Sequence, residues 1–477
     1  MSEIIKFNDR EFSFECGVIS QRSQQSLDGT TKTNTTLAPI SYNTLQELVI
    51  NDSLFDPFLD ATLTIKTNGN GVEATPLLGF EFYSNNNNGV IFKIQPIDVL
   101  KLNDQFKSDN TLEFYGVVCY QTVYGSDNSI EQLQEFKLQD IKEAKLRETK
   151  VAAVNIPNVM SSKSIQANIV DITSNIIGIG ENNFFPAEQL KSNTLLNETS
   201  IRFDYTYPNH FNGFDAINFL LPYNITTING LPIQNILKYN YTTAQFFNIP
   251  VVYPFLNPFQ DYSNLETFVI GEDDSVPVPG FNQGATSQGP SPNIVLPSNK
   301  VNNIAYNNIN FDIANNDLLP ICVMNTTNPL NITSMVYVDL QEEIKLFDNN
   351  IIKQELTQLY GNDVKLNIDI DESKLNKLNY KIINTNLPIN IAVDVAKAQL
   401  YNSFIFQNMY MTFTVPGQPY REPGKFINIK KTLTENTGSA TQRKIIGQWL
   451  VTEVKHVFSG DGRYTNVIQC VKPFINK

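Results

Sequence analysis

The chain has 477 residues, enough for about three domains of ordinary size. Its formal net charge of -13 argues against a general phosphate-binding surface, because such surfaces need clustered lysine and arginine. Only 17% of the residues are charged, and uncharged polar residues, above all asparagine and threonine, take their place. These residue types favour strands and turns over long helices, so a large, mainly β protein is predicted.

Residues 1–125 predict a first β domain. Its segments suggest about six or seven short strands at barrel-like spacing, separated by turn-forming residues. One strand–turn–strand unit spans Glu47–Ile65, with a turn at Asn51-Asp52-Ser53 and Pro57 beyond it. The run Asn68-Gly69-Asn70-Gly71 marks a further turn.

Residues 126–225 predict an α/β middle domain. Between 130 and 150 the charge rises and apolar residues recur at helical spacing, so a helix and a domain boundary are expected there. The segment 163–180 predicts a helix that ends at a glycine, and 201–225 predicts a strand, a loop and a short helix from about Asp215.

Residues 226–385 predict a loop-rich insertion with some strands. The span 255–300 is rich in proline, glycine and serine, which indicates an extended loop or arm with little to bury. Strand-like segments return at about 300–345 and are expected to contribute in part to a second β domain.

Residues 386–477 predict a helix followed by the terminal strands of that second β domain. The helix is expected over Asn390–Gln407, with Ile391, Val395, Ala398 and Tyr401/Asn402 along one side. Strands then follow, and the stretch Gly447–Pro473 closes the chain as a hairpin.

The terminal hairpin holds the chain's only tryptophan, Trp449, and one of its two histidines, His456. Strand alternation places Leu450, Thr452, Val454, His456 and Phe458 on one side, and Trp449, Val451, Glu453 and Lys455 on the other. A catalytic histidine needs a nucleophile within hydrogen-bond reach and an orienting carboxylate, and neither occurs at a recognisable spacing. His456 is therefore interpreted as a packed or interface residue.

The rare residue types give little support to a metal or redox centre. The cysteines are Cys16, Cys119, Cys322 and Cys470, without zinc-type spacing, and Cys119 and Cys470 are predicted to be buried in apolar strands. Two histidines far apart exclude a histidine-rich metal site. No cofactor is expected.

Other candidate sites are weak. His210 follows Pro-Asn and is predicted to lie in a loop. Asp369, Asp371 and Glu372 lack the glycine that a calcium loop needs at its bend. Glu272-Asp273-Asp274 reads as a solvated acidic turn.

Two glycine motifs are also structural. Gly178-Ile179-Gly180 lacks the third glycine of a dinucleotide fingerprint and follows a helix-like segment. Ser459–Arg463 has turn chemistry, with glycines expected to supply positive φ. No catalytic, cofactor-binding or metal-binding residue is predicted, and the protein is not expected to be an enzyme.

No apolar run is long enough to span a bilayer. The first residues, MSEIIKFNDREF, lack a basic region followed by an apolar core, so no signal peptide is expected. We expect a protein made and kept in a cytoplasm.

Several stretches together resemble the baseplate hub proteins of contractile-tailed bacteriophages. Glu47–Ile65 resembles their unit of strand, acidic turn, proline and strand, and Thr75–Ser84 matches the next strand, although hubs often have an acidic residue near Phe80. Ile201–Leu220 is similar to their strand, Pro-Asn, loop and helix. Thr414–Ile429 and the terminal hairpin resemble the end of the family's chain. The span from about 225 to 385 has no counterpart.

This resemblance implies a trimeric hub that joins the hexameric tail tube to the trimeric central spike. It implies two tail-tube-like antiparallel β-barrels in each chain, with the α/β middle region between them. The implied partners are a second and third copy of the chain, the tail tube protein, the central spike protein and baseplate wedge proteins, with the tape measure protein as a further candidate. Genomic DNA would pass through the lumen without specific binding, as the acidic charge favours. The implied location is the tail baseplate of the virion.

Two alternatives stay open from the residues alone. High asparagine and tyrosine content would suit a glycan-binding or glycan-cleaving tail component, such as a receptor-binding protein. A tail tube or capsid structural protein would also be mainly β, but a tube subunit has one barrel rather than two.

Overall fold

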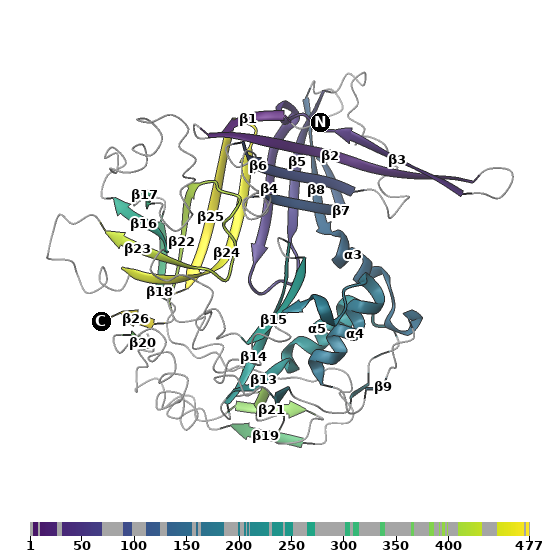
Figure 1. Ribbon diagram of the computed structural model, residues 1–477, viewed down its shortest axis with the longest axis vertical. Helices are drawn as coiled ribbons and strands as arrows, with labels where there is room; N and C mark the ends of the chain where they lie inside the picture. Colours follow the sequence, from purple (N-terminus) through teal and green to yellow (C-terminus); the bar gives the residue numbers. More distant parts are fainter. Residues whose placement is uncertain are drawn as a thin grey trace.

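The protein, a computed structural model, consists of one large sheet with a smaller α/β unit beside it (Figure 1). The large sheet occupies the upper part of the view, and the helices lie below it. The structure describes residues 3–7, 10–25, 31–68, 89–97, 111–124, 131–154, 159–160, 164–185, 199–200, 205–206, 208, 210–228, 231–241, 244–250, 265–271, 301–305, 309–313, 334–338, 364–366, 381–385, 391, 394–395, 398, 409–431, 446–471 and 474–476.

The large sheet has 15 strands, in the order β1-β2-β6-β7-β8-β5-β4-β24-β23-β16-β17. Off this path, β3 pairs with β2, and β18, β22 and β25 pair in sequence up to β24. Its strands are β1 (Glu3–Phe7), β2 (Arg10–Gln25), β3 (Thr31–Pro39), β4 (Leu45–Ser53), β5 (Asp60–Asn68), β6 (Gly89–Pro96), β7 (Leu112–Tyr124), β8 (Glu131–Asp140), β16 (Glu266–Gly271), β17 (Val301–Ala305), β18 (Ile309–Ile313), β22 (Met409–Pro416), β23 (Phe426–Lys431), β24 (Gly447–Ser459) and β25 (Arg463–Val471).

The α/β unit packs three helices against a five-stranded sheet of order β10-β15-β14-β13-β11. Its elements are α3 (Ile141–Glu148), α4 (Ile165–Ile177), α5 (Gly213–Leu220), β10 (Phe184–Phe185), β11 (Thr199–Ser200), β13 (Ile225–Ile228), β14 (Leu231–Asn240) and β15 (Gln245–Pro250). Short pairs are β9 (Val159–Met160) with β12 (Tyr205–Thr206), β19 (Ser334–Val338) with β21 (Lys381–Thr385), and β20 (Val364–Leu366) with β26 (Phe474–Asn476). The 3-10 turns are η1 (Tyr42–Thr44), η4 (Val151–Val154), η5 (Glu181–Asn183) and η6 (Leu221–Tyr223).

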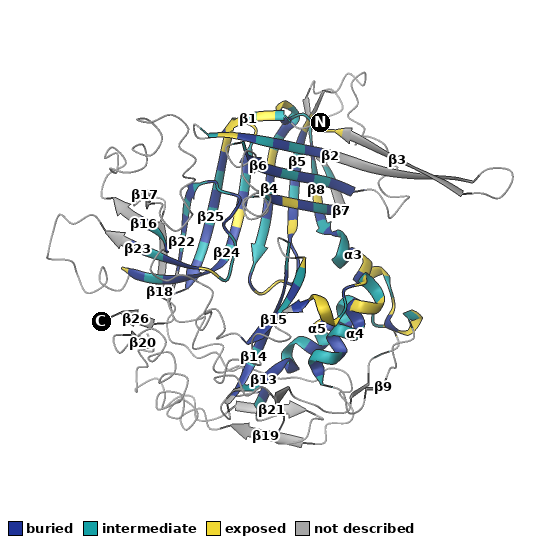
Figure 2. Ribbon diagram, in the orientation of Figure 1, coloured by how far each residue is buried: buried dark blue, intermediate teal, exposed yellow. Residues whose placement is uncertain are grey.

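The large sheet is buried around two separate cores (Figure 2). The first core lies among the N-terminal strands, where alternate residues such as Leu48, Leu63 and Phe136 point inward. The second core lies among the C-terminal strands and includes Phe268, Met411 and Trp449. The prediction of a mainly β protein is confirmed. Two closed barrels are not shown, since the order of the described strands does not return to its start.

Strand β24 joins the two halves of the sheet. Its residues 447–450 pair with β23, and its residues 453–459 pair with β4 of the N-terminal half. Accordingly, Trp449 and Val454 belong to the second core, whereas Phe458 belongs to the first.

The side chains of β24 do not alternate regularly between the two faces of the strand. A bulge at Thr452, between the pairs Val451–Cys470 and Glu453–Gln469, inserts one residue into the strand. A bulge shifts the alternation by one residue, so Val451 before it and Val454 after it point to the same core. The prediction that placed Trp449 and Val451 opposite Val454 was therefore wrong.

Two further predictions need correction. Residues 131–140, predicted to be helical, form strand β8, whose Phe136 and Leu138 alternate into the first core; the helix α3 begins only at Ile141. Cys119, predicted to be buried, is exposed, because a register shift between Val118 and Tyr120 displaces it from the regular pattern.

Helix predictions in the α/β unit are confirmed. Helix α4 begins at the N-cap Ser164 and ends at Gly178, whose φ of 75° gives the left-handed cap. Helix α5 begins after Asn212, whose side chain accepts a hydrogen bond from the Asp215 amide at 2.8 Å.

The predicted face of Ile391, Val395 and Ala398 is also helical and buried. These residues pack in the core of the α/β unit with α4 and α5. On sequence alone, this helix is instead grouped with the terminal strands of the second β domain.

The span 255–300 is not loop throughout. Within it, β16 pairs in parallel with β23 on one side and with β17 on the other. Strand β18 pairs with β22. Strands from the middle of the sequence thus extend the C-terminal half of the sheet. No helix among the described residues is both long and apolar enough to cross a membrane.

Candidate functional site

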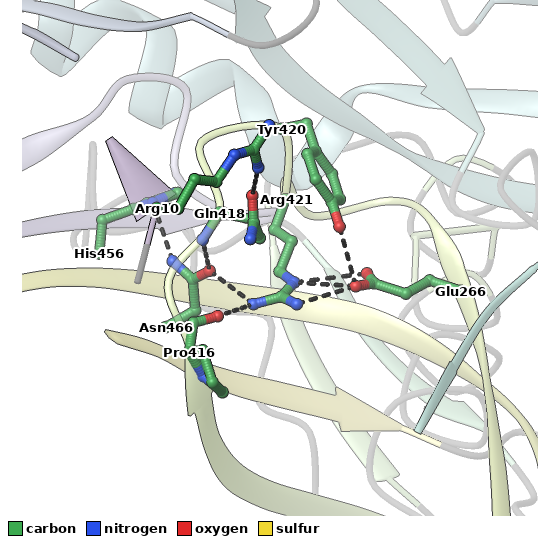
Figure 3. Close-up of polar contacts among 8 residues, drawn as sticks. All are labelled: Arg10, Glu266, Pro416, Gln418, Tyr420, Arg421, His456 and Asn466. Atoms are coloured by element: carbon green, nitrogen blue, oxygen red, sulfur yellow. Dashed lines mark hydrogen bonds and ion pairs between the residues drawn. The ribbon is translucent and has the colours of Figure 1, made fainter. Parts of the chain in front are cut away.

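A buried polar cluster lies beside β24, on the loop that joins β22 to β23 (Figure 3). We call it the seam cluster, because it lies where the two halves of the sheet meet. Its members come from β16, the β22–β23 loop, β24 and β25. Six of them, Glu266, Gln418, Tyr420, Arg421, His456 and Asn466, are drawn in Figure 3, and the seventh is Tyr464, whose hydroxyl contacts His456.

Arg421 is the centre of the seam cluster and is only 5% exposed. Its Nη2 donates to Glu266 Oε1 at 2.8 Å, and its Nη1 donates to Asn466 Oδ1 at 2.9 Å and to the Pro416 carbonyl. Burial, the largest single effect, lowers the pKa of Arg421, but the nearby Glu266 carboxylate and the smaller contributions of Tyr420 and Tyr464 together outweigh it and raise that pKa. The arginine therefore stays charged.

The side-chain amide of Asn466 links Arg421 to His456 through hydrogen bonds. Its Oδ1 accepts hydrogen bonds from the Gln418 amide at 2.7 Å and from Arg421, so its Nδ2 faces the imidazole. That Nδ2 donates to His456 Nδ1 at 2.9 Å. Nδ1 is then an acceptor, and the proton of the neutral ring belongs to Nε2.

His456 is fully buried, and its ring is kept neutral. Burial, and then the positive charge of Arg421, lower its pKa to about 3. The Tyr464 hydroxyl lies 2.8 Å from Nδ1. A hydrogen bond with the Arg421 backbone opposes this lowering to a smaller extent. A base of such low pKa in a sealed position is poorly suited to proton transfer near neutral pH.

The N-terminal half of the sheet also contributes to the seam cluster and to its surroundings. Arg10 of β2 donates from Nη1 to Gln418 Oε1 at 2.5 Å. The first core reaches the cluster through Tyr464, whose ring stacks on Phe458 with centroids 4.1 Å apart.

A second set of buried polar contacts joins the large sheet to the α/β unit. Lys238 Nζ forms an ion pair with Asp52 Oδ1 at 2.5 Å and donates to the Asp56 carbonyl at 3.1 Å. Burial raises the pKa of Asp52, although Lys238 opposes this.

Tyr241 makes a parallel link. Its hydroxyl donates to Asp140 Oδ2 at 2.7 Å and accepts from the Leu59 amide at 3.1 Å. Burial raises the pKa of both Asp140 and Tyr241. Because Asp140 also caps helix α3, one carboxylate connects the end of β8, the helix and β14–β15.

The two polar sets border one cavity of about 300 Å³, which we call the junction cavity. It lies between β14–β15, the turn after β4, the start of β7 and the β22–β23 loop. Among the residues that line it are Asp52, Leu54, Leu59, Ile236, Lys238, Tyr241, Ile249, Arg421, Glu422, Lys425 and His456.

Most residues singled out from the sequence do not meet at a common site. His210 is in an exposed turn, as predicted, and Gly178 caps a helix. Cys16 and Cys470 are buried and free. Cys322, Asp369, Asp371, Glu372 and Glu272-Asp273-Asp274 lie outside the described residues. Within the described part of the chain, no group of three or more metal-ligating side chains comes together.

Sequence reasoning missed Arg421, Asn466, Asp52 and Lys238. The signal for Arg421 was a lone arginine in the proline-rich turn Gln418–Gly424, in a chain with few charged residues. For Lys238, a single lysine within the apolar strand β14 was the corresponding signal.

No protein-family model matches the sequence, and no curated protein gives a significant match. Solved structures of similar layout include a 43 kDa tail protein of a Shewanella oneidensis prophage, at 10% identity and a TM-score of 0.47, over 97% of this chain and 99% of that one. A tail protein of Neisseria meningitidis is 8% identical, with a TM-score of 0.43 over 96% of each chain. An Escherichia coli component of the type VI secretion system is 9% identical, with a TM-score of 0.37 over 91% of this chain and 73% of that one. At these scores and identities the similarities establish neither family nor function.

Proposed function

We propose that this chain is a structural protein of a phage tail baseplate, without enzymatic activity, and that three copies form the hub between the tail tube and the central spike. The observation that supports this most directly is β24, which is shared by two halves of one sheet, each with its own core. A ring of three such chains presents six β units, and this number matches a sixfold tube.

The proposed domains follow from this reading. Residues 1–125 and 386–477 would form two tube-like β-barrels, with strands of the insertion 226–385 completing the second. Residues 126–225 would form the middle α/β domain that widens the ring toward the spike. The pairing of β16 and β18 with C-terminal strands supports the contribution of the insertion.

The ends of the large sheet suggest how copies would meet. Among the described strands, β1 and β17 end the main path and β3 and β18 end its branches, and backbone groups at a sheet edge can pair with another chain. Pairing an edge of one copy with a different edge of the next is a heterologous contact, which closes into a ring when the rotation allows. Tail tube, spike and wedge proteins, with the tape measure protein as a further candidate, would bind this ring. The net charge of -13 suits a lumen that DNA passes without binding.

A glycan-binding function is less well supported. Trp449, the only tryptophan, and Tyr464 are fully buried in the cores, so neither ring can stack on a sugar from solvent.

Native mass spectrometry of the purified chain, followed by electron microscopy of particles, tests the proposal. The expected result is a mass three times that of the 53.9 kDa chain, and three copies around the tail axis beneath the tube. A sixfold ring of the isolated protein would favour a tube role. Hydrolysis of cell-wall glycan that is abolished by changing one carboxylate would refute the proposal.

A further inference from the structure

Strands β2 and β3 form an arm that extends beyond the large sheet (Figure 1). The pairing of β2 with β6 ends at the pair Ile19–Gly89, whereas its pairing with β3 continues for six further residue pairs. Residues 20–25 and 31–36 therefore pair with each other and with no third strand among those described. A two-stranded ribbon alone is marginally stable in water, so a third strand would stabilise this arm.

The outer edge of β3 is the least protected edge of the large sheet. β3 has nine residues, whereas the other three end strands among those described, β1, β17 and β18, have five each. Proteins protect sheet edges with short strands, charged side chains, prolines or bulges. In β3 the only charged residue is Lys32, the only proline is the last residue, and the register with β2 has no bulge. Its outer backbone groups are thus suited to pairing with another chain.

The composition of the arm indicates which partner it fits. Residues 20–25 and 31–36 include no apolar side chain, so the arm has nothing to insert into a membrane or a hydrophobic groove. Addition of a strand needs no apolar surface, because main-chain hydrogen bonds supply the affinity. The same residues carry Arg22 and Lys32 and no acidic group, whereas the whole chain has a net charge of -13. A second copy of the chain therefore has the complementary charge.

We propose that the outer edge of β3 pairs with an end strand of the C-terminal half of the sheet in a second copy of the chain. This inference rests on the proposed function, and it names the contact that holds neighbouring hub subunits together. Pairing between two β3 edges would be isologous and would end at a dimer. An N-terminal edge on a C-terminal edge is heterologous, and such contacts can close a ring of three.

A variant with a shortened arm tests this pairing. Replacing residues 21–35 by Asn-Gly joins the register partners Ser20 and Thr36 by a two-residue hairpin turn and keeps all the pairs of β2 with β6. Native mass spectrometry over a dilution series would measure assembly, and urea denaturation would check that each chain is folded. We expect the concentration of half-dissociation to rise about tenfold or more in the shortened chain.

The outcomes separate this inference from the hub function. A native trimer that the shortened chain also forms, with equal affinity, would overturn the pairing and leave the hub function standing. A native assembly of another copy number would refute the hub, and the pairing would then be decided by whether the shortened chain dissociates. A native chain that stays monomeric would overturn both.

A second pair of variants keeps the full length of the arm. Asn34→Glu/Thr35→Glu adds acidic charge at successive positions of β3, which should repel an acidic partner and hinder edge pairing. Asn34→Gln/Thr35→Gln is the matched control, because glutamine has nearly the same shape without the charge. We expect the Glu variant to dissociate at a concentration about tenfold higher than the Gln variant. Equal dissociation of the two would contradict the pairing, even if the shortened chain does not fold.

Discussion

Two ion pairs of the same chemical type lie against the terminal hairpin, an inner, buried pair beside its His456–Asn466 rung and an outer, exposed pair at its tip. In the inner pair, Arg421 and Glu266 are 2.8 Å apart, with side chains only 4% and 10% exposed. At the tip, Arg463 Nε donates to Asp461 Oδ2 at 2.7 Å, but these side chains are 72% and 47% exposed. The solvent exposure of each ion pair, rather than its residue types, decides how much the pair contributes to stability.

The inner pair is one part of a network, whereas the outer pair stands in solvent. Losing one partner of a buried pair leaves an uncompensated charge away from water, which is costly. Losing one partner of an exposed pair leaves a hydrated charge, which costs little. Five single substitutions and one double variant compare the buried side of the hairpin with its tip, from the largest expected effect to the smallest.

Arg421→Met should reduce the free energy of unfolding by about 3–5 kcal/mol, because the buried Glu266 carboxylate loses the cation that compensates its charge and Asn466 loses a donor. Urea denaturation at neutral pH would measure this loss. The double variant Arg421→Met/Glu266→Leu should lose less than Arg421→Met alone, since it removes the stranded charge. A double variant as unstable as the sum of both single changes would contradict this account.

His456 should make stability depend on pH below about 6.5. Its pKa is about 3 in the folded chain and near 6.5 when unfolded, so between these values the unfolded state binds the extra proton. Stability is therefore lost as pH falls through this window. Relative to His456→Gln, the native chain should lose about 2 kcal/mol between pH 6.5 and 4.5. Urea midpoints at both pH values measure it.

The comparison with His456→Gln isolates the histidine. Asp52 and Asp140 have raised pKa values, so their protonation stabilises the folded state as pH falls, but they are present in both proteins. Parallel pH profiles for the two proteins would contradict a neutral, buried imidazole.

The turn at the tip contains two glycines with different requirements. A Cβ on Gly460 would lie 2.2 Å from the Leu45 carbonyl oxygen, so Gly460→Ala should cost about 1–3 kcal/mol. Gly462 has a φ of 88° with open space around it, and Gly462→Ala should cost about 1 kcal/mol through backbone strain alone. Thermal unfolding of both variants would show the order, and a larger loss for Gly462→Ala would contradict it.

Asp461→Asn should leave the urea midpoint at pH 7 unchanged. The hydrogen bonds from Arg463 lower the pKa of Asp461 to about 2, but both groups are in water, where the lost contact is replaced by hydration. A loss comparable to that of Arg421→Met would show that exposure does not separate the two ion pairs.

The local residue pattern was enough to predict a helix with its cap, the buried face of a helix, and a hairpin turn. Helix α4 with its end at Gly178, the face of Ile391, Val395 and Ala398, and the hairpin turn at Ser459–Arg463 were all read correctly. In each, the residues that specify the structure are within a few positions of one another. Of the two glycines in that turn, only Gly462 has the positive φ expected.

Bulges and shared strands were not predictable in this way. The bulge at Thr452 is specified by pairing with β25 and by the Leu54 amide, which donates to the Thr452 carbonyl at 2.8 Å. Likewise, the alternation of Phe136 and Leu138 competes with a helical pattern, and pairing with β5 and β7 decides for the strand.

By itself, the sequence determined that this is a mainly β protein, where helix α4 ends, and that His456 lacks the neighbours of a catalytic base. Only the tertiary structure decided what surrounds that histidine. Asn466 is ten residues away along the hairpin, Arg421 is 35 positions before His456, and Glu266 is 155 positions before Arg421. A polar cluster assembled across such separations is stable only because the two cores exclude water around it, and no local pattern records that.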